Sequence, residues 1–351
     1  MKPSLRTIAQ ALDVSVMTVN RALNSHPAVS SETRRRVLAE VKRQGYDYET
    51  RSRNIRIDRR KRVALFCCER KLYGDSLCNF FLRLHYLAQK RLRSMGYLPV
   101  PLDPSDAAGE MLRQLEKCGA LLILGPLELP GGGEGNFFLK QIRQRFPELK
   151  ILSVLGDETG EMTSVVPDDY EGGARAARQA YQKGHRHAAV FLAQEESSFR
   201  RRTAGFAGEF RLSGEDARCD VISYPRPVGN GPAAPIRQML RTYLTANAGA
   251  LPTLFFVPGG YDTTMLLDEL SAQKFSVPED FCVIGYDNLE LLTLRTPEVT
   301  RIYFDLKSLI YNAVSILQAM PDARAFRETV ILTPNRFCAG ASLIRREEMR
   351  R

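Results

Sequence analysis

The sequence has no tryptophan, and among its 351 residues it has only four histidines and seven cysteines. The cysteine count is odd and no two cysteines have the C-x-x-C spacing, so we expect free thiols in a reducing compartment and no disulfide framework. His185 and His187 are one residue apart, but no cysteine or carboxylate stands at metal-site spacing from them. We therefore expect no metal and no cofactor.

Long apolar segments are absent too. No run of about 18 apolar residues could cross a membrane, and residues 1–6 lead into a polar amphipathic segment without the apolar stretch of a secretory signal. The motif Gly-x-Ser-x-Gly is missing, and the glycine-rich segment 130–135 lacks the Lys-Ser/Thr pair of a phosphate-binding loop. With no catalytic set visible, we expect a cytoplasmic protein that is not an enzyme and has no membrane partner.

The sequence does have an excess of positive charge, and the excess is localised. The formal net charge is +10, and residues 1–62 contain 15 Lys and Arg against 6 Asp and Glu. The remaining residues contain 35 basic and 34 acidic side chains. A basic N-terminal head on a nearly neutral body is typical of a module that binds a polyanion such as nucleic acid.

Three segments of the head have apolar residues at three- or four-residue spacing, which predicts three amphipathic helices. Residues 13–15 separate the first two, with Ser15 as N-cap of the second, and Ser30 or Ser31 caps the third, which closes at Gln44 and Gly45. The apolar positions are Leu5, Ile8, Ala9 and Leu12, then Val16, Val19 and Leu23, then Val37, Leu38 and Val41. This pattern predicts a helix-turn-helix fold; a small helical bundle with a basic surface is the alternative.

The second helix of the head is short and carries few charges, so it can enter a DNA major groove. It exposes Val16, Met17, Asn20 and Arg21. An arginine can donate two hydrogen bonds to guanine, and apolar side chains can contact the methyl group of thymine.

The head resembles the signature of the LacI/GalR family of bacterial repressors. The match consists of Ile8-Ala9, residues 14–24 (VSVMTVNRALN), residues 29–37 (VSSETRRRV) and Gly45-Tyr46. The resemblance implies that Val16, Met17 and Arg21 read bases. It implies that phosphates are held by Ser15, Thr18, Asn20, Asn24 and Thr33.

Residues 51–56 stand where this family has a hinge helix that forms on operator DNA. Ile55 falls at the position of the leucine that wedges into the minor groove, with Arg53 and Arg56 beside it. Apolar wedges kink DNA, and a β-branched wedge is stiffer, so we expect a different preferred central step. A plain basic linker over residues 50–62 is the alternative.

After Arg62 the sequence changes to short apolar runs separated by helical segments. The runs typical of buried strands are residues 63–68, 120–124, 151–155, 188–192, 253–257 and 281–285. This alternation predicts doubly wound parallel sheets with helices on both faces, and about 290 residues is long for one such sheet, so we expect two lobes. Ligands bind beyond the carboxyl ends of such strands, which places the expected site in a cleft between the lobes.

The resemblance to the LacI/GalR family continues through the body. It implies an all-α helix-turn-helix head joined to an α/β body of two lobes, similar to type I periplasmic binding proteins. The expected ranges are 1–48 for the head, 49–62 for the hinge and linker, and 63–351 for the body, with lobe 1 at about 63–164 and 296–326 and lobe 2 at about 165–295 and 327–351.

Two residues of the body are implied by the resemblance to face an effector. Arg202 begins an Arg-x-x-Gly-Phe motif, and Asp287 follows Gly285-Tyr286. A guanidinium donates to two oxygens and a carboxylate accepts from hydroxyls, which suits a polyhydroxyl ligand. The alternative for each residue is a structural ion pair. We expect a carbohydrate effector.

The sequence departs from the family at two places near this site. Gly259 and Gly260 stand where many relatives have an Asn-Asp pair that faces the ligand. Tyr261 and Asp262 are the candidates to replace that pair. The loop over residues 69–76 is longer than usual, and its Tyr73 and Asp75 are candidates to reach the cleft.

We interpret the chain as a DNA-binding transcription regulator, a repressor that binds a pseudo-palindromic double-stranded operator as a homodimer. Residues 343–351 leave no room for the heptads that make some relatives tetrameric. A small molecule in the cleft is expected to control DNA affinity. The first alternative is a regulator of the same fold that is controlled by a partner protein or has no effector. More remote alternatives are a cytoplasmic solute-binding protein and an enzyme on a sugar or nucleotide.

Overall fold

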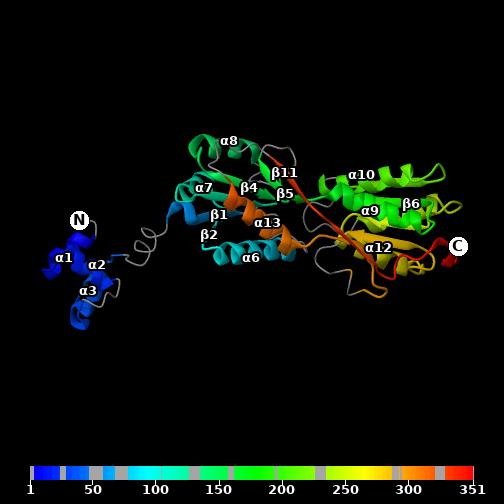
Figure 1. Cartoon of the computed structure of the whole chain (residues 1–351). Helices are drawn as coiled ribbons and strands as arrows, with labels where there is room; N and C mark the ends of the chain where they lie inside the picture. The colour runs from blue at the N-terminus through cyan, green and yellow to red at the C-terminus, as the bar shows by residue number, and fades with distance from the viewer. Residues whose placement is uncertain are drawn as a thin grey trace. The chain divides into compact units, whose positions relative to one another are not determined.

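The computed structural model divides the chain into two compact units, Met1–Lys61 and Arg62–Arg351 (Figure 1). The two units meet after residue 61, whereas the boundary between linker and body was expected after residue 62. The structure describes every residue except 1–3, 24–28, 47–57, 68–77, 104, 126–134, 157–161, 194–196, 226–234, 287–291, 293–294, 321–328 and 351. No helix in the described ranges is long and apolar enough to cross a membrane.

The first unit contains the three expected helices, α1 (Leu5–Leu12), α2 (Val16–Leu23) and α3 (Ser31–Arg43). Ser15 and Ser30 cap α2 and α3 by accepting hydrogen bonds from the amides of Thr18 and Thr33. The three helices share one small core of Ile8, Ala9, Val19, Ala22, Leu23 and Val37.

One expected core position of the head is wrong. Leu38 is 48% exposed, although its neighbour Val37 is fully buried. Successive residues of a helix point about 100° apart, so a helix that packs on a narrow stripe buries one of two adjacent apolar residues and exposes the other.

The second unit contains two six-stranded sheets, one in each lobe. The strand order of lobe 1 is β11-β5-β4-β3-β1-β2, and every pair is parallel. Its strands are β1 (Arg62–Phe66), β2 (Leu98–Pro101), β3 (Ala120–Leu124), β4 (Lys150–Val154), β5 (Thr163–Pro167) and β11 (Val330–Thr333). Its helices are α6 (Cys78–Ser94), α7 (Ala108–Leu115), α8 (Gly135–Arg145) and α13 (Leu306–Ala319), and a short turn η1 (Arg59–Lys61) precedes β1.

The sheet of lobe 2 has the order β12-β10-β9-β8-β6-β7, with only β12 antiparallel to its neighbour. Its strands are β6 (His187–Ala193), β7 (Arg218–Tyr224), β8 (Leu254–Val257), β9 (Cys282–Tyr286), β10 (Thr300–Tyr303) and β12 (Arg336–Cys338). Its helices are α9 (Asp169–Gln182), α10 (Ser197–Leu212), α11 (Pro235–Ala246) and α12 (Gly260–Ala272), with the short turn η4 (Arg346–Glu348) near the C-terminus.

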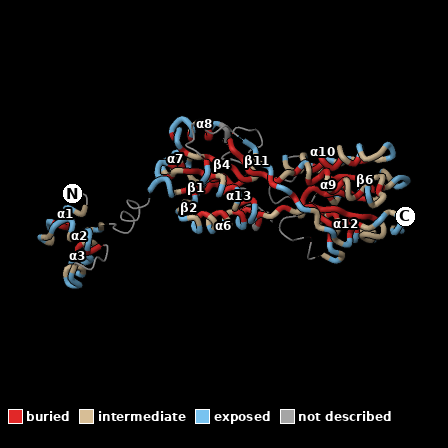
Figure 2. The backbone as a smooth tube through the Cα atoms, in the orientation of Figure 1, coloured by how far each residue is buried: buried red, intermediate tan, exposed pale blue. Residues whose placement is uncertain are grey.

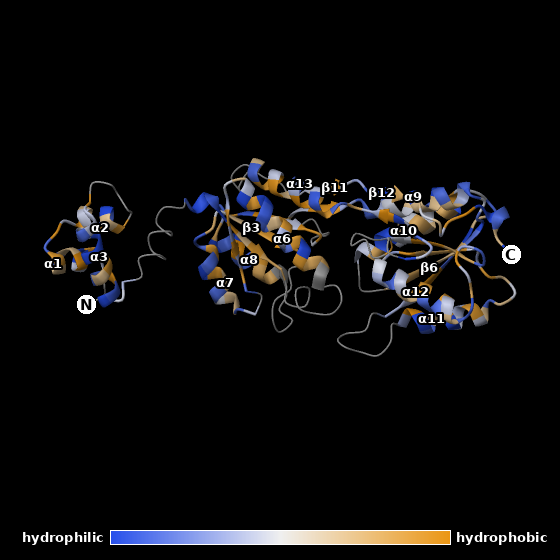
Figure 3. Cartoon of the chain, turned by 90° about the horizontal axis from the view of Figure 1, so that it is seen from below, coloured by the Kyte–Doolittle hydropathy of each residue, from blue (hydrophilic) through white to orange (hydrophobic). Residues whose placement is uncertain are grey.

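Helices cover both faces of each sheet, and the strands between them are buried (Figures 2 and 3). In lobe 1, α6 and α13 pack on one face, and α7 and α8 pack on the other. In lobe 2, α9 and α10 pack on one face, and α11 and α12 pack on the other. The expected fold class, an all-α helical head and a doubly wound two-lobed α/β body, is confirmed.

The chain crosses between the lobes three times, and all three crossings come later than expected. β5 pairs with β4 and β11, so residues 163–167 belong to lobe 1, although lobe 2 was expected to begin at about 165. β10 pairs with β9, so residues 300–303 belong to lobe 2, although lobe 1 was expected to resume at 296. β11 pairs with β5, so residues 330–333 belong to lobe 1, although lobe 2 was expected to resume at 327. Strand pairing determines these boundaries, and the local sequence does not reveal which sheet accepts a short strand.

Candidate DNA interface and effector site

The head presents one face of α2 to solvent because the opposite face forms its core. Val19, Ala22 and Leu23 are buried, which turns Val16 and Met17 outward with 41% and 62% of their surface exposed. Asn20 and Arg21 are also exposed. At the start of this helix the Ser15 hydroxyl accepts from the amide of Thr18 at 2.9 Å and lies 2.8 Å from the hydroxyl of Thr18.

A partly buried set of hydrogen bonds joins α1 to the C-terminal end of α3. Gln44 donates from its amide to Glu40 and accepts at 2.8 Å from the hydroxyl of Thr7. Arg43 donates two hydrogen bonds to the same Glu40 carboxylate, at 2.6 and 2.7 Å. These bonds from Arg43 and Gln44 lower the pKa of Glu40 to about 2. The other two helices of the head, on which α2 packs, are therefore joined to each other by side-chain hydrogen bonds.

Arg202, the expected effector ligand, is buried in lobe 2 on α10. Its Nε donates to Asp169 Oδ1 at 2.8 Å, and its Nη1 donates to the carbonyl of Pro258 at 2.7 Å. Its guanidinium lies 3.6 Å from the centre of the Tyr286 ring. Burial lowers the pKa of Arg202, but the charge and hydrogen bond of Asp169 together with the contact to Tyr286 outweigh this effect and raise that pKa above its usual value.

Asp169 is the first residue of α9, directly after the first crossover, and it collects further contacts. Its Oδ1 lies 2.9 Å from the hydroxyl of Tyr286, which lies 2.7 Å from Asn335 Oδ1. Burial and the Asp169 charge raise the pKa of Tyr286 well above its usual value, so this hydroxyl keeps its proton. Asn335, on the third crossover, also donates to the backbone carbonyl of Asp168. We call Asp169, Arg202, Tyr286 and Asn335 the crossover cluster.

The crossover cluster joins segments that enter and leave lobe 2. A second arginine, Arg201, lies 3.7 Å from Asp169 Oδ2, so one buried carboxylate faces two guanidinium groups. The cluster therefore has the two kinds of group that bind a polyhydroxyl ligand, a guanidinium and a carboxylate, already bonded to each other.

Gly259 and Gly260 begin α12 beside this cluster. A Cβ atom at residue 259 would lie 2.5 Å from the ring of Phe199, so this ring occupies the space that a side chain at this position would need. The same ring lies 5.3 Å from the Arg202 guanidinium. Of the two suggested replacements, Asp262 is buried and Tyr261 is 39% exposed.

Several expected site residues lie outside the described residues. They are Asn24 in the head, Arg53, Ile55 and Arg56 in the hinge, and Tyr73, Asp75 and Asp287 in the body. Sequence analysis also missed residues that the structure brings to Arg202: Asp169, Tyr286, Asn335 and Phe199. The only signal for Asp169 and Tyr286 was their position at the ends of family motifs.

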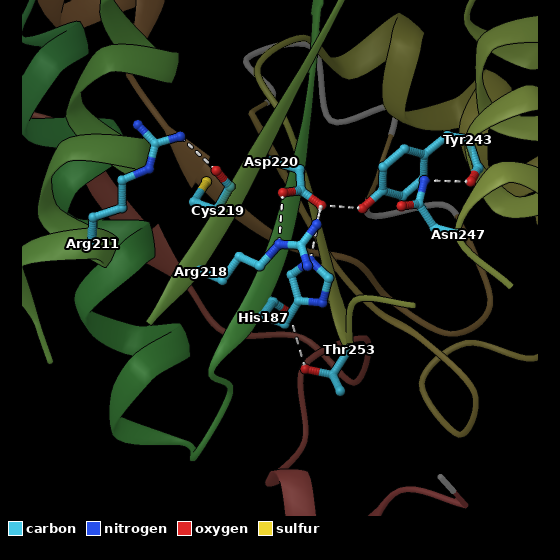
Figure 4. A network of polar contacts seen from close by, with 8 residues as sticks. All are labelled: His187, Arg211, Arg218, Cys219, Asp220, Tyr243, Asn247 and Thr253. Atoms are coloured by element: carbon cyan, nitrogen blue, oxygen red, sulfur yellow. Dashed lines mark hydrogen bonds and ion pairs between the residues drawn. The ribbon is translucent and has the colours of Figure 1, made fainter. Parts of the chain in front are cut away.

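The two histidines of lobe 2 have structural partners. His187 and Arg218 both contact the carboxylate of Asp220, which also accepts from Tyr243 at 2.7 Å (Figure 4). Burial raises the pKa of Asp220, and these three donors outweigh it and lower that pKa to about 2. The described residues contain no group of three His, Cys, Asp or Glu side chains that could hold a metal ion.

His185 joins the C-terminal segment to lobe 2, and this contact predicts a pH dependence. Its ring nitrogens lie 2.9 Å from Thr253 Oγ1 and 3.1 Å from the carbonyl of Ile344, and burial lowers its pKa from 6.5 to about 4. Below pH 6.5 the unfolded chain therefore binds a proton at His185, whereas the folded chain binds this proton only near pH 4. We expect the free energy of unfolding to fall by about 2 kcal/mol between pH 6.5 and pH 5.

Urea unfolding at both pH values measures this effect, with His185→Gln as the control. The variant lacks the titrating ring, so its free energy of unfolding should change less over the same interval. An equal pH dependence in the two proteins would contradict the assignment to His185.

Two family models match the chain. The model of bacterial regulatory proteins of the lacI family matches residues 4–47, and the model of the periplasmic binding protein-like domain matches residues 177–343. An HTH-type transcriptional regulator of Lachnoclostridium phytofermentans is 23% identical over 325 residues, which cover 88% of this chain and 90% of that protein.

Solved structures have the same fold. A lac repressor dimer bound to operator and the anti-inducer ONPF matches with a TM-score of 0.68 at 17% identity, over 98% of this chain and 100% of that chain. The transcriptional regulator CelR in complex with cellobiose matches with a TM-score of 0.63 at 18% identity, over 97% of this chain and 99% of that chain.

Proposed function

The chain belongs to the LacI family of bacterial regulatory proteins, and we propose that it is a repressor that binds a pseudo-palindromic operator as a homodimer under the control of a small molecule. Members of this family are DNA-binding transcription regulators and not enzymes. The observation that carries the proposal is the outward face of α2, where Val16, Met17 and Arg21 are exposed above a buried core.

We assign base reading to Val16, Met17 and Arg21 in the major groove. Thr18 and Thr33 stand at or near helix N-termini beside the serine caps, where hydroxyls and amides suit phosphate oxygens. The proposed phosphate contacts are Ser15, Thr18, Asn20, Asn24 and Thr33, and the proposed hinge contacts are Arg53, Ile55 and Arg56.

Replacement of Arg21 by alanine tests the base-reading role. We expect a loss of about 1–3 kcal/mol of discrimination at one base pair, because the bidentate pairing with guanine is removed. Selection of bound sequences from a randomised duplex library measures this preference. The control is Arg35→Ala, an exposed arginine of α3, which should leave every base preference intact. An unchanged preference in Arg21→Ala would remove this residue from the base-reading set.

Dimerisation is supported by an exposed apolar face in lobe 1. Leu82 and Tyr86 are 44% and 62% exposed, and they lie one turn apart on α6. A two-fold operator requires a two-fold protein, and the related lac repressor binds its operator as a dimer. Light scattering on the purified chain tests this step, and a monomer at micromolar concentration would contradict it.

We propose that the effector is a sugar and that it binds beside the crossover cluster. The support is the guanidinium of Arg202, the buried carboxylates of Asp169 and Asp262, and the cellobiose bound by the structural relative CelR. Tyr261, Tyr73, Asp75 and Asp287 are the further proposed contacts.

A specific observation favours a second candidate, a regulator controlled by a partner protein or by no effector. Phe199 fills the space of a side chain at Gly259, and Asp169 already neutralises Arg202. Both features reduce the polar surface that a sugar needs.

A thermal-shift screen of the whole chain against sugars, sugar phosphates and nucleosides separates the two candidates. A ligand at 100 times its Kd should stabilise the fold by about 2.7 kcal/mol, which raises Tm by a few degrees. Loss of a hit in Asp262→Asn, with an unchanged Tm of the free protein, would locate the ligand beside α12. The absence of any hit, with DNA binding intact, would favour the second candidate.

A further inference from the structure

One side of lobe 1 is strongly basic, namely the edge at which strands β1, β3 and β4 begin. β1, β3 and β4 are parallel and start at this edge, as shown by the bonds from the Gly119 amide to the Arg62 carbonyl at 2.9 Å and from the Lys150 amide to the Gly119 carbonyl at 3.2 Å. The helices between these strands run in the opposite direction, so their last turns gather at the same edge.

The cationic side chains come from each kind of element at this edge. They are Arg62 and Lys150 at the starts of β1 and β4, Lys117 before β3, Arg93 in the last turn of α6, and Arg143 and Arg145 in the last turn of α8. We call this set the basic edge. Figure 1 shows the start of β1 at this end of the lobe.

Few negative charges offset this set. Among the described residues of the body the carboxylates at this edge are Glu116 and Glu148. Glu116 is paired with Arg145. The residues after 62 contain 35 basic and 34 acidic side chains, so the body as a whole is almost neutral, whereas basic side chains outnumber the described carboxylates at this edge.

We propose that the basic edge binds the phosphates of duplex DNA as a second contact, independent of base sequence, in addition to the head. Duplex DNA carries one negative charge per about 1.7 Å, and exposed lysines and arginines release its counterions on binding. The DNA-reading head is covalently joined to this edge through residues 47–61, so a duplex bound by the head has a raised effective concentration for the body. This inference depends on the proposed DNA-binding function.

The triple variant Arg93→Gln, Lys117→Gln and Arg143→Gln tests the proposal in the full-length protein. The probe is a fluorescein-labelled duplex of 60 base pairs with arbitrary sequence, and anisotropy gives its affinity from 50 to 200 mM salt. We expect the slope of log K against log salt to become shallower by about 1 to 3, since each lost phosphate contact contributes about 0.9. Affinity at 100 mM salt should fall at least about tenfold.

The matched control removes three positive charges from lobe 2. Lys274, Arg345 and Arg350 are exposed, and their replacement by glutamine changes the net charge equally. This control should keep the wild-type slope. Equal slopes for both triple variants would overturn the proposal and leave the basic residues as counter-charges of the helix C-termini. If the wild-type protein does not bind the duplex, the proposed DNA-binding function itself fails.

Thermal melting of each variant checks that the fold is retained. If the triple variant unfolds, Lys117→Gln alone provides the test, because Lys117 is exposed in the turn before β3. Its slope should then fall by about 0.9, and an unchanged slope would count against the basic edge.

Discussion

Replacement of Asp169 by alanine is expected to lower the free energy of unfolding of the body by about 3–5 kcal/mol. Asp169 is 2% exposed and is bonded to the buried guanidinium of Arg202, so the substitution leaves a positive charge without its counter-charge inside the protein. Chemical denaturation followed by circular dichroism measures the loss.

The control is an ion pair of similar chemistry near the surface. Asp268 pairs with Arg295 at 2.6 Å, but the Asp268 side chain is 36% exposed. Water hydrates the remaining arginine when such a pair is broken, so Asp268→Ala should lower the free energy of unfolding by less than about 1 kcal/mol. Equal costs at the two aspartates would contradict the assignment of a buried charge at Asp169.

A double variant separates the pair from its surroundings. Asp169→Ala combined with Arg202→Met removes both charges, and an apolar replacement of a buried ion pair is often close to neutral. We expect the double variant to be more stable than Asp169→Ala alone. A double variant that is less stable would show that Arg202 contributes through Pro258 and Tyr286 rather than through Asp169.

The position of this pair connects stability with the proposed regulation. Asp169 follows the first crossover and Asn335 lies on the third, and both contact the Tyr286 hydroxyl at the end of β9. A ligand that binds Arg202 or Asp169 would change hydrogen bonds on two of the three segments that join the lobes. Differential binding of this kind is what a ligand needs in order to shift a protein between two arrangements.

Most of the central strands were predictable from the sequence because both of their faces are buried. The exception is β5, which is buried along its whole length but was not among the predicted runs. β1, β3, β4, β6, β8 and β9 all fall within the predicted apolar runs or differ from them by one or two residues. Parallel strands with helices on both sides need continuous apolar sequence, which makes them visible.

The peripheral strands were not predictable. β2 has the sequence LPVP, whose two prolines are tolerated because β2 is an edge strand. β7 is the edge of the other sheet, and only Cys219 and Tyr224 of its seven residues are buried. β10 and β11 have four residues each, and only the tertiary structure determines the sheet that they join.

The site was predictable in part. The family motif identified Arg202, but no local pattern identifies Asp169, Tyr286 and Asn335 as its neighbours, since they come from three distant segments. Gly259 was recognised as a departure from the family, but the ring of Phe199 that lies beside it comes from another helix and was not foreseen. Contacts between distant segments are the information that one sequence does not contain.

The second large effect is expected from adding a single methyl group at Gly205. This glycine of α10 packs against α9, and a Cβ atom there would lie 2.0 Å from the carbonyl oxygen of Tyr170. Gly173 makes the reciprocal contact, with its Cβ position 2.0 Å from the carbonyl oxygen of Arg202. The obstacles are backbone atoms, so the helices must separate, and we expect Gly205→Ala to cost about 3 kcal/mol in free energy of unfolding.

A glycine in an open helix provides the control. Gly109 of α7 has nothing within 4 Å of its Cβ position, so Gly109→Ala should leave stability unchanged or raise it by up to about 1 kcal/mol. Denaturation of both variants measures the difference. Equal effects would mean that the helices tolerate separation and that the glycine of the Arg-x-x-Gly-Phe motif has no packing role.

The expected loss also bears on the effector site. Separation of α9 from α10 would move Asp169 away from Arg202, because each helix carries one partner of this pair. Phe206 resists that movement, since its ring stacks on Phe256 of the sheet at 4.4 Å. We therefore expect Gly205→Ala and Asp169→Ala to be less than additive when combined, because both disrupt the same pair of charges.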